Sequence, residues 1–521
     1  MAQRSDEESP LLSGREVHSR HWSITTSLLV VLLLGELMSH AETTLLFTTS
    51  ALIASEFASL EAAVWLVTGY TLGVCAAQPL YGKLSDIFGR KAVLLCAYSL
   101  SASGCIICGS SPSIWMIIAG RAVGGLGGAG LMIISSIIIT DSVPKSYVAQ
   151  YRSYINIAST LGRGVGGPLG GYILDNAQWR WLFFSRVPVL CILAAMIALL
   201  FDGRMSDTDL AHDPVGQDKS FRTKLREIDY IGAVLLSSSI TIANILINGD
   251  SRSSLGSALL SIGLVASLST FVYFELSQAH NPIINLRILT RRNVAVSYII
   301  VHLQVITQIT LMLSVPIYFQ VTRGESASAS GMRLVPAIAA NTAGALLAGR
   351  YIRKVRRFRS ILLVAGPIGC LSYILALSRG DGSTAPWESV YVVPGGAATG
   401  MATSAAFISM TSCLEQEHVA VATGIFFLVS SMGSSLGVSV DNAITQSLFK
   451  KHLLARLQRQ DKVEIIRQVT SDIRVIANMP DDIRGTIIKA FVDALRATFA
   501  FGFILSLVPS LVATMVEDAE I

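Results

Sequence analysis

The sequence predicts an all-α polytopic membrane protein with fourteen membrane-spanning helices. Of its 521 residues, 52% are hydrophobic and only 14% are charged, a balance that soluble chains of this length do not show. Uninterrupted apolar runs recur along the whole chain. A helix needs about 20 apolar residues to cross roughly 30 Å of hydrocarbon. Runs of that length therefore favour helices over the strands of a closed barrel.

The apolar runs define the candidate spans. We expect them at residues 26–48, 63–82, 92–109, 114–139, 148–174, 182–201, 230–248, 256–275, 295–319, 331–349, 360–378, 390–412, 418–445 and 492–515. Lys and Arg gather in alternate connections between these runs, for example Lys83 to Lys91 and Arg353 to Arg359. Cytoplasmic loops carry such an excess. Both termini are therefore expected on the cytoplasmic side.

The connection at residues 448–490 does not fit this alternation, because it is rich in Lys and Arg but falls on the lumenal side by parity. Its apolar residues recur at helical spacing, as at Leu453, Leu457 and Ile466. Either it is an amphipathic cap on the far side, or the span count is wrong. We expect the cap.

Charge and cysteine content exclude several other roles. The net charge of +5 comes from short clusters between spans, which membrane orientation explains without nucleic acid. Seven cysteines lie in or beside apolar runs, so no disulfide framework is expected. Cys105 and Cys108 form a single CxxC in an apolar setting, which favours helix packing over a metal site. We expect no metal and no cofactor.

One short polar string between two apolar runs carries the strongest motif. It is GKLSDIFGRK at residues 82–91 and resembles the hallmark loop of the major facilitator superfamily. The matching residues are Gly82, Asp86, Gly89, Arg90 and Lys91. The resemblance implies a gate latch, in which the glycines let two helix ends approach and the carboxylate caps a neighbouring helix. The alternative is that these residues serve topology only.

Two further glycine-rich strings fit the same family. Arg121 precedes a run of glycines that resembles the family's RxxxGxG motif. An arginine inside a span is functional by default, unless it lies near the helix end and snorkels. Gly166, Pro168 and Gly170 resemble the antiporter motif of the fifth span, in which small residues allow close helix packing. The match departs from the usual GPxxGG by one residue. Arg163 is an unexpected charge there, with two roles open: holding a substrate carboxylate or neutralising an acid within the bundle.

Similar strings run along most of the chain, including WLVTGY at residues 65–70 and PIYFQ at residues 316–320. Together they resemble the fourteen-span drug:proton antiporter branch, and most closely the fungal vacuolar basic amino acid transporters. The resemblance implies the major facilitator fold, with two six-helix bundles plus two additional helices. The expected divisions are a tail (1–23), the N-terminal bundle (24–201), a linker (202–228), an inserted pair (229–276), five helices of the C-terminal bundle (277–447), the amphipathic loop (448–490), and the last helix with its tail (491–521).

Polar residues in the first span are the leading candidates for binding. Glu42 stands where related transporters commonly carry an aspartate, and we predict it as the proton or cation site. Glu36 and His40 are four residues apart, on one helix face. They form either a proton relay, since histidine titrates near neutral pH, or a mutually satisfied pair.

Four more polar residues complete the predicted site. Asp441 with Asn442 is expected opposite the first span, unless it caps a helix kink. Tyr70 and Asn341 line the cavity or bond between helices. Glu42 or Asp441 together with Arg163 would match the charges of a cationic amino acid.

The N-terminal tail carries a possible sorting signal. Glu7, Leu11 and Leu12 fit the acidic dileucine pattern, although short strings of this kind recur by chance. On a cytoplasmic tail the signal would bind a sorting adaptor and deliver the protein to a vacuolar or lysosome-like membrane.

These features predict a secondary transporter that moves basic amino acids into the vacuolar lumen in exchange for protons, acting as a monomer in the bilayer and carrying no enzymatic activity. A plasma-membrane drug or toxin exporter is the first alternative. A nontransporting sensor on the same fold is the second, although it would not need the gate loop, Arg121 or the glycine-rich fifth span. A GxxxxGK[ST] string is absent from the sequence, which argues against an ATP-driven pump.

Overall fold

The computed structural model describes residues 25–143, 145–201, 229–248, 254–277, 289, 291–379, 385–457, 462–471, 475–476 and 479–518. Every element in this part of the chain is helical. The predicted sorting signal and the predicted linker at 202–228 lie outside the described residues.

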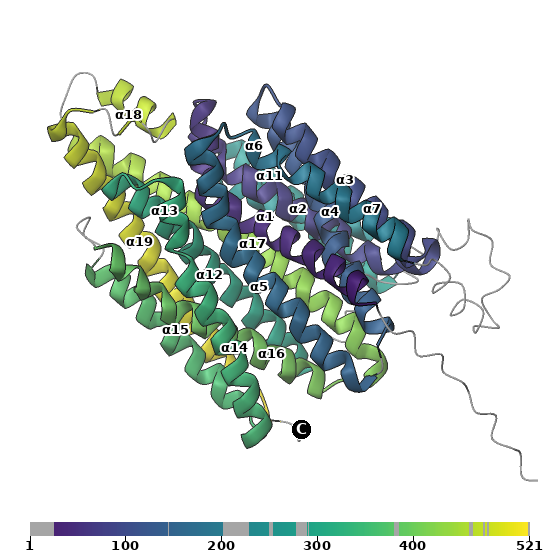
Figure 1. Cartoon of the computed structure of the whole chain (residues 1–521). Helices are drawn as coiled ribbons and strands as arrows, with labels where there is room; N and C mark the ends of the chain where they lie inside the picture. Colours follow the sequence, from purple (N-terminus) through teal and green to yellow (C-terminus); the bar gives the residue numbers. More distant parts are fainter. Residues whose placement is uncertain are drawn as a thin grey trace, which may run out of the picture.

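The N-terminal half forms one bundle (Figure 1). Its elements are α1 (Thr26–Glu56), η1 (Leu60–Ala62), α2 (Ala63–Phe88), α3 (Arg90–Ser110), α4 (Ile114–Asp141), α5 (Lys145–Asn176), α6 (Trp181–Phe184) and α7 (Arg186–Leu200). An inserted pair follows, comprising α10 (Tyr230–Ile247) and α11 (Ser254–Ser277). α11 packs on α10 and exposes most of its apolar side chains, as expected for a helix that faces lipid.

The C-terminal half forms the second bundle beside the first (Figure 1). Its elements are α12 (Arg292–Arg323), α13 (Ala327–Met332), α14 (Val335–Val355), α15 (Arg359–Arg379), η3 (Pro386–Val392), α16 (Val393–Ser412), α17 (Gln416–Arg456), α18 (Lys462–Ser471) and α19 (Asp481–Ala513). The all-helical fold agrees with the prediction.

Within the described residues, 12 helices are long and apolar enough to cross a membrane. α5 and α16 are not among them. α16 is rich in Gly, Ala, Ser and Thr and packs against α12, α14 and α15, so close helix packing accounts for its low hydropathy. α5 carries charged residues, Arg163 among them, and packs against α1, α13 and α14.

Two helices near the C-terminus are longer than their apolar runs predicted. α17 continues to Arg456, and α19 begins at Asp481, so the connection between them is shorter than expected. The polar extensions pack against each other, because Arg456 pairs with Asp493 and the rings of Phe449 and Phe491 lie 5.3 Å apart in an edge-on arrangement. Hydropathy marks the apolar slab and misses helix that continues beyond it.

The two ends of the helical bundles carry different elements, after which they are named. The gate-loop end carries the turn at Gly89, and the α18 end carries η1 and α18. α18 is the amphipathic segment expected in this region: Ile465, Ile466 and Val469 are buried, and the helix packs on α17 and η1. It therefore joins the two bundles at the α18 end.

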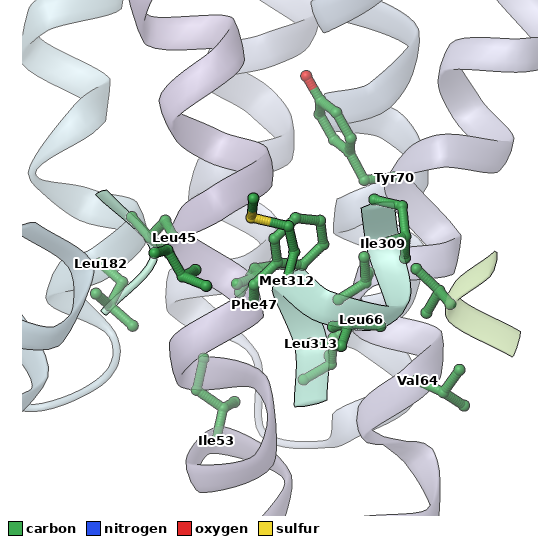
Figure 2. Close-up of a cluster of buried hydrophobic side chains, with 14 of the residues drawn as sticks. Leu45, Phe47, Ile53, Val64, Leu66, Tyr70, Leu182, Ile309, Met312 and Leu313 are labelled. Carbon is green, nitrogen blue, oxygen red and sulfur yellow. The ribbon is translucent and has the colours of Figure 1, made fainter. Parts of the chain in front are cut away.

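An apolar cluster joins the bundles near this end. Figure 2 shows Phe47 of α1 and Leu66 of α2 in one cluster with Ile309, Met312 and Leu313 of α12. Polar contacts supplement it, since the amide of Gln320 in α12 donates to the carbonyl of Thr48 in α1 at 3.0 Å. The bundles are thus in contact at the α18 end.

α5 and α13 are also joined at the α18 end. The Asp175 carboxylate accepts from the backbone N–H groups of Ala327 and Ser328 at 3.2 and 3.0 Å. These are the first residues of α13, where unpaired N–H groups favour an anionic partner. Gly171 lies against the same residues, and a Cβ there would meet the Ser328 nitrogen at 2.2 Å. A side chain at this position would push the bundles apart.

We predict that Asp175→Ala opens the α18 end. Losing a capping carboxylate costs roughly 0.5–2 kcal/mol, which would raise the exposure of residues between the bundles several-fold. A single cysteine at Ala51, in a background without the native cysteines, reports this through its rate of reaction with a membrane-impermeant thiol reagent. Asn176→Ala is the matched control, since the Asn176 amide donates to its own helix at Tyr172. Equal rates in both variants would contradict the capping role.

Candidate functional site

A buried carboxylate held between two arginines lies inside the N-terminal bundle. Glu42 of α1 is 4% exposed. One oxygen pairs with Arg121 of α4, and the other lies 2.5 Å from Nη2 of Arg186 in α7. Arg121 also donates to the carbonyl of Leu66 at 3.1 Å, and its guanidinium lies 4.4 Å from the ring centroid of Tyr70. Three helices that are distant in sequence meet at this one carboxylate.

The glycines after Arg121 make room for this cluster. Gly124 and Gly128 follow Arg121 at helical spacing on one face of α4. A Cβ on Gly128 would meet the Tyr70 hydroxyl at 2.1 Å, and one on Gly124 would lie 3.6 Å from a Glu42 oxygen. The predicted RxxxGxG motif therefore supplies both a charge and the space around it.

This geometry decides between the alternatives left open for Arg121. The side chain is 2% exposed and paired, so it does not snorkel. Tyr70 is buried beside it and shares a 3.4 Å hydrogen bond with Ser39. The Tyr70 hydroxyl thus bonds between helices.

Glu36 and His40 share one face of α1, as their spacing predicted. His40 Nε2 lies 3.1 Å from Oε1 of Glu36. Glu36 is 5% exposed, and its second oxygen, Oε2, is buried without a hydrogen-bond partner in the described structure. The pair is therefore not fully satisfied within itself.

Arg163 lies on α5, the helix that packs along α1. Its Nε is buried and has no hydrogen-bond partner in the described structure. Arg163 and Glu36 form no ion pair with each other. Sequence reasoning proposed Arg163 for a ligand or for charge neutralisation, and the structure leaves its Nε available.

Asp441 of α17 is a buried acid in the C-terminal bundle. It is 6% exposed and accepts a hydrogen bond of 2.9 Å from the hydroxyl of Ser314 in α12. Among the described residues it forms no ion pair. Both residues line a small cavity of about 60 Å³. Residues of both bundles line it: Ala51, Leu60, Ser314, Ile317, Asp441, Asn442, Thr445, Gln446, Phe449, Val469, Ile476, Phe491 and Leu495.

Asn442 follows Asp441 and connects the site to the inserted pair. Its amide donates to the side chain of Asn248, directly after α10, at 3.1 Å. Earlier along the same two helices, the side chain of buried Asn244 in α10 donates to Ser435 of α17 at 3.1 Å and accepts from Ser439 of α17 at 2.5 Å. These side chains attach α10 to the helix that carries Asp441.

The remaining predicted residues lie apart from these clusters. Asn341 is half-buried on α14. Its backbone carbonyl lies against Gly400 of α16, and a Cβ on Gly400 would lie 1.8 Å from that carbonyl oxygen. This position records close backbone contact between α14 and α16. Its role in lining the cavity remains a prediction.

The gate-loop residues contact one another and the N-terminal bundle. Asp86 pairs with Arg90, which also lies 3.4 Å from Asp141 at the end of α4. Lys91 donates to the carbonyl of Ala198 near the end of α7 at 2.7 Å. Gly89 has a φ of 84°, the region that glycine tolerates best, and it separates α2 from α3. A Cβ on Gly82 would meet nothing within 4 Å, so close approach does not require glycine there in this structure.

The glycines of α5 pack against α1. A Cβ on Gly166 would lie 2.3 Å from the carbonyl oxygen of Ala41, and one on Gly170 would lie 2.6 Å from the Leu45 side chain. Pro168 lies within α5 between them. The sequence predicted a helix that packs closely against a partner, and α1 is that partner.

Sequence reasoning missed Arg186 and Ser314. Arg186 begins the apolar helix α7 and lies inside the predicted span at 182–201. An arginine inside a span is itself a signal of function. Ser314 gave no signal, because serine in a span is common. Cys105 and Cys108 are both buried and unpaired.

We predict that Glu42→Gln destabilises the protein. The change leaves two buried arginines with a neutral partner, and breaking a buried pair in this way costs roughly 3–5 kcal/mol. Thermal unfolding of the purified protein in detergent, followed by tryptophan fluorescence, should show a clearly lower Tm. Glu61→Gln, which neutralises an exposed acid on η1, is the control and should leave Tm unchanged. A Tm equal to that of the wild type for Glu42→Gln would show that the cluster is not a structural constraint.

Comparisons with known proteins identify relatives of this chain. Vacuolar membrane amino acid uptake transporter fnx2 of Schizosaccharomyces pombe is 30% identical over 481 residues, covering 91% of this chain and 81% of that protein. Multidrug resistance protein fnx1 of the same organism is 31% identical over 498 residues, covering 93% and 90%. Vacuolar basic amino acid transporter 2 of Saccharomyces cerevisiae is 24% identical over 455 residues, covering 85% and 95%.

The fold and the family have independent matches. The structure is similar to that of a bacterial homologue of the human lysosomal transporter Spinster in an inward-facing conformation, with a TM-score of 0.60 and 13% identity, over 94% of this chain and 96% of the other. Residues 32–438 match the family described as the Major Facilitator Superfamily. This chain, a multi-pass transporter, therefore belongs to the Major Facilitator Superfamily.

Proposed function

We propose that this transporter moves basic amino acids (lysine, arginine and histidine) across the vacuolar membrane into the lumen, in exchange for protons. Two of its relatives are vacuolar amino acid transporters by name, and one of these names basic amino acids. The observation that carries the proposal is Asp441, a buried acid without an ion-pair partner among the described residues, beside a cavity between the bundles.

The proposed topology has fourteen spans. α5 and α16 join the 12 helices that meet the length and hydropathy criteria, so both termini lie on one side. The basic connections at Lys83 to Lys91 and Arg353 to Arg359 lie at the gate-loop end, which is then cytoplasmic, and α18 is lumenal. Alternating access would come from rocking of one bundle against the other, with the gate-loop residues and the α5 glycines as moving contacts.

Different roles follow for Glu42 and Asp441, which are both buried. A proton on Glu42 would remove one acceptor from a pair of buried arginines, which makes Glu42 better suited to holding α1, α4 and α7 together. Asp441 has a hydroxyl partner that stays neutral, so its carboxyl can gain or lose a proton without stranding a cation. We therefore assign the exchangeable proton to Asp441.

The first test measures uptake of labelled lysine, arginine and histidine into sealed vesicles with an acidic interior. We expect uptake by the wild type that a protonophore abolishes. Asp441→Asn should abolish this gradient-driven uptake while leaving lysine–lysine exchange intact, because exchange moves no net proton. Glu464→Gln, an exposed acid on α18, should behave as the wild type.

Two outcomes would overturn this assignment. Active wild-type protein that moves hydrophobic cationic drugs but none of the three amino acids would support the exporter, which the similarity to multidrug resistance protein fnx1 keeps as the second candidate. Proton-driven uptake that survives in Asp441→Asn would move the proton to another acid.

Localisation separates the same two candidates in cells. If the tail carries a dileucine signal, replacing Leu11 and Leu12 with alanine should shift a fluorescent fusion from the vacuolar membrane to the plasma membrane. Ser13→Ala, which lies in the tail but outside the dileucine pattern, is the control and should leave the fusion at the vacuolar membrane. A wild-type fusion found at the plasma membrane would favour the exporter.

A further inference from the structure

α1 and α5 run in the same direction and touch along a line of glycines. Cβ atoms on Gly162 and Gly166 would each lie 2.3 Å from the carbonyl oxygens of Leu37 and Ala41. The register is therefore Leu37 opposite Gly162 and Ala41 opposite Gly166. This register determines where the neighbouring side chains leave the contact.

Helix geometry sends three charged or titratable side chains to the same side of this contact. Successive helical residues are about 100° apart, at 3.6 residues per turn. Glu36 comes one residue before Leu37, and Arg163 comes one residue after Gly162. Because the two helices are parallel, the side chains of Glu36 and Arg163 therefore point to the same side of the contact. His40 lies one turn beyond Glu36 on the same face of α1.

That side faces the C-terminal bundle. Phe47 lies on the same face of α1, further along the helix, and belongs to the cluster with Met312 of α12 in Figure 2. Glu36 and Arg163 therefore lie where α1 and α5 turn toward the other bundle, the region in which a transported molecule must bind.

The two side chains are complementary and incompletely bonded. Oε2 of Glu36 and Nε of Arg163 are both buried without a hydrogen-bond partner in the described structure. Leaving a charged group unsatisfied in this way costs more than a hydrogen bond contributes, so each such atom calls for an explanation. A salt bridge between them would satisfy both atoms, but the structure does not contain one.

We infer that Glu36 and Arg163 bind the zwitterionic head group that every α-amino acid carries. The substrate carboxylate would accept from the Arg163 guanidinium, whose planar donors suit a carboxylate. The α-ammonium would donate to Oε2 of Glu36, while His40 holds Oε1. This inference rests on the proposed amino acid transport and adds the residues that select an amino acid over a simple cation.

The inference is tested with ligands that lack one half of the head group. Binding of lysine, cadaverine (no carboxylate) and 6-aminohexanoate (no α-ammonium) is measured on the purified full-length protein by competition against labelled lysine. The wild type should bind lysine about ten- to a hundredfold more tightly than either analogue, since each missing charged hydrogen bond is worth roughly 1.5–3 kcal/mol. This comparison needs no variant, so folding defects cannot mislead it.

Two variants then test whether Arg163 binds the substrate carboxylate and Glu36 binds the α-ammonium. Arg163→Gln should weaken lysine binding to the level of cadaverine and leave cadaverine unchanged. Glu36→Gln should weaken lysine to the level of 6-aminohexanoate and leave 6-aminohexanoate unchanged. Arg163→Lys and Glu36→Asp, which keep the charges, should recover part of the preference, and a Tm measurement confirms that each variant is folded.

The outcomes separate this inference from the proposed function. Lysine binding with no preference over the analogues, or a preference that survives both Gln variants, would overturn the head-group site and leave amino acid transport standing. A wild type that binds none of the three ligands but binds hydrophobic cations would overturn both.

Discussion

The N-terminal bundle depends on how charges are accommodated away from water. Burying an ion without partners is prohibitive, and a buried pair is tolerated only when its hydrogen bonds are completed. Glu42 meets this requirement by giving one oxygen to Arg121 and the other to Arg186, while the Leu66 carbonyl and the Tyr70 ring take up more of the Arg121 guanidinium. The cluster fixes α1, α4 and α7 relative to one another, and so fixes the face that α1 turns toward α5.

Glycines of α5 connect α1 to the interface between the two bundles. On one face of α5, Gly162 and Gly166 lie against the backbone of α1; on another, Gly167 and Gly171 lie near α13. The helix thus touches both bundles through positions without side chains, where contacts depend on backbone proximity. Such contacts can re-form when the helices shift, whereas the ion cluster on the other side of α1 cannot rearrange without exposing a buried charge. In the alternating access proposed above, the ion cluster would therefore stay fixed while the glycine contacts of α5 move.

The sequence predicted the parts of this arrangement that follow from local spacing. Long apolar runs predicted the helices, and the four-residue spacing of Glu36 and His40 predicted their contact. The two bundles, and the motif of Arg121 with its glycines, came from the resemblance to the family. Contacts between distant segments were not predictable in the same way. Nothing near Arg186 indicates that it reaches Glu42, and Ser314 is one of many serines in spans. The extensions of α17 and α19 were missed because their buried apolar residues, such as Leu453 and Ile487, alternate with charged residues and form no uninterrupted apolar run.

The acids of the site differ in one physical respect, namely what each would leave behind on protonation. Glu42 would leave two arginines short of an acceptor, and Asp441 would leave only a neutral hydroxyl. Glu36 lies between these cases, because one oxygen is bonded to His40 and the other is free. An acid with a free oxygen beside an unsatisfied cation is suited to a ligand that carries both charges, since only such a ligand completes both groups at once. A proton could satisfy Glu36 but would do nothing for Arg163. This asymmetry is why we separate the proton, at Asp441, from the amino acid head group, at Glu36 and Arg163, within one transporter.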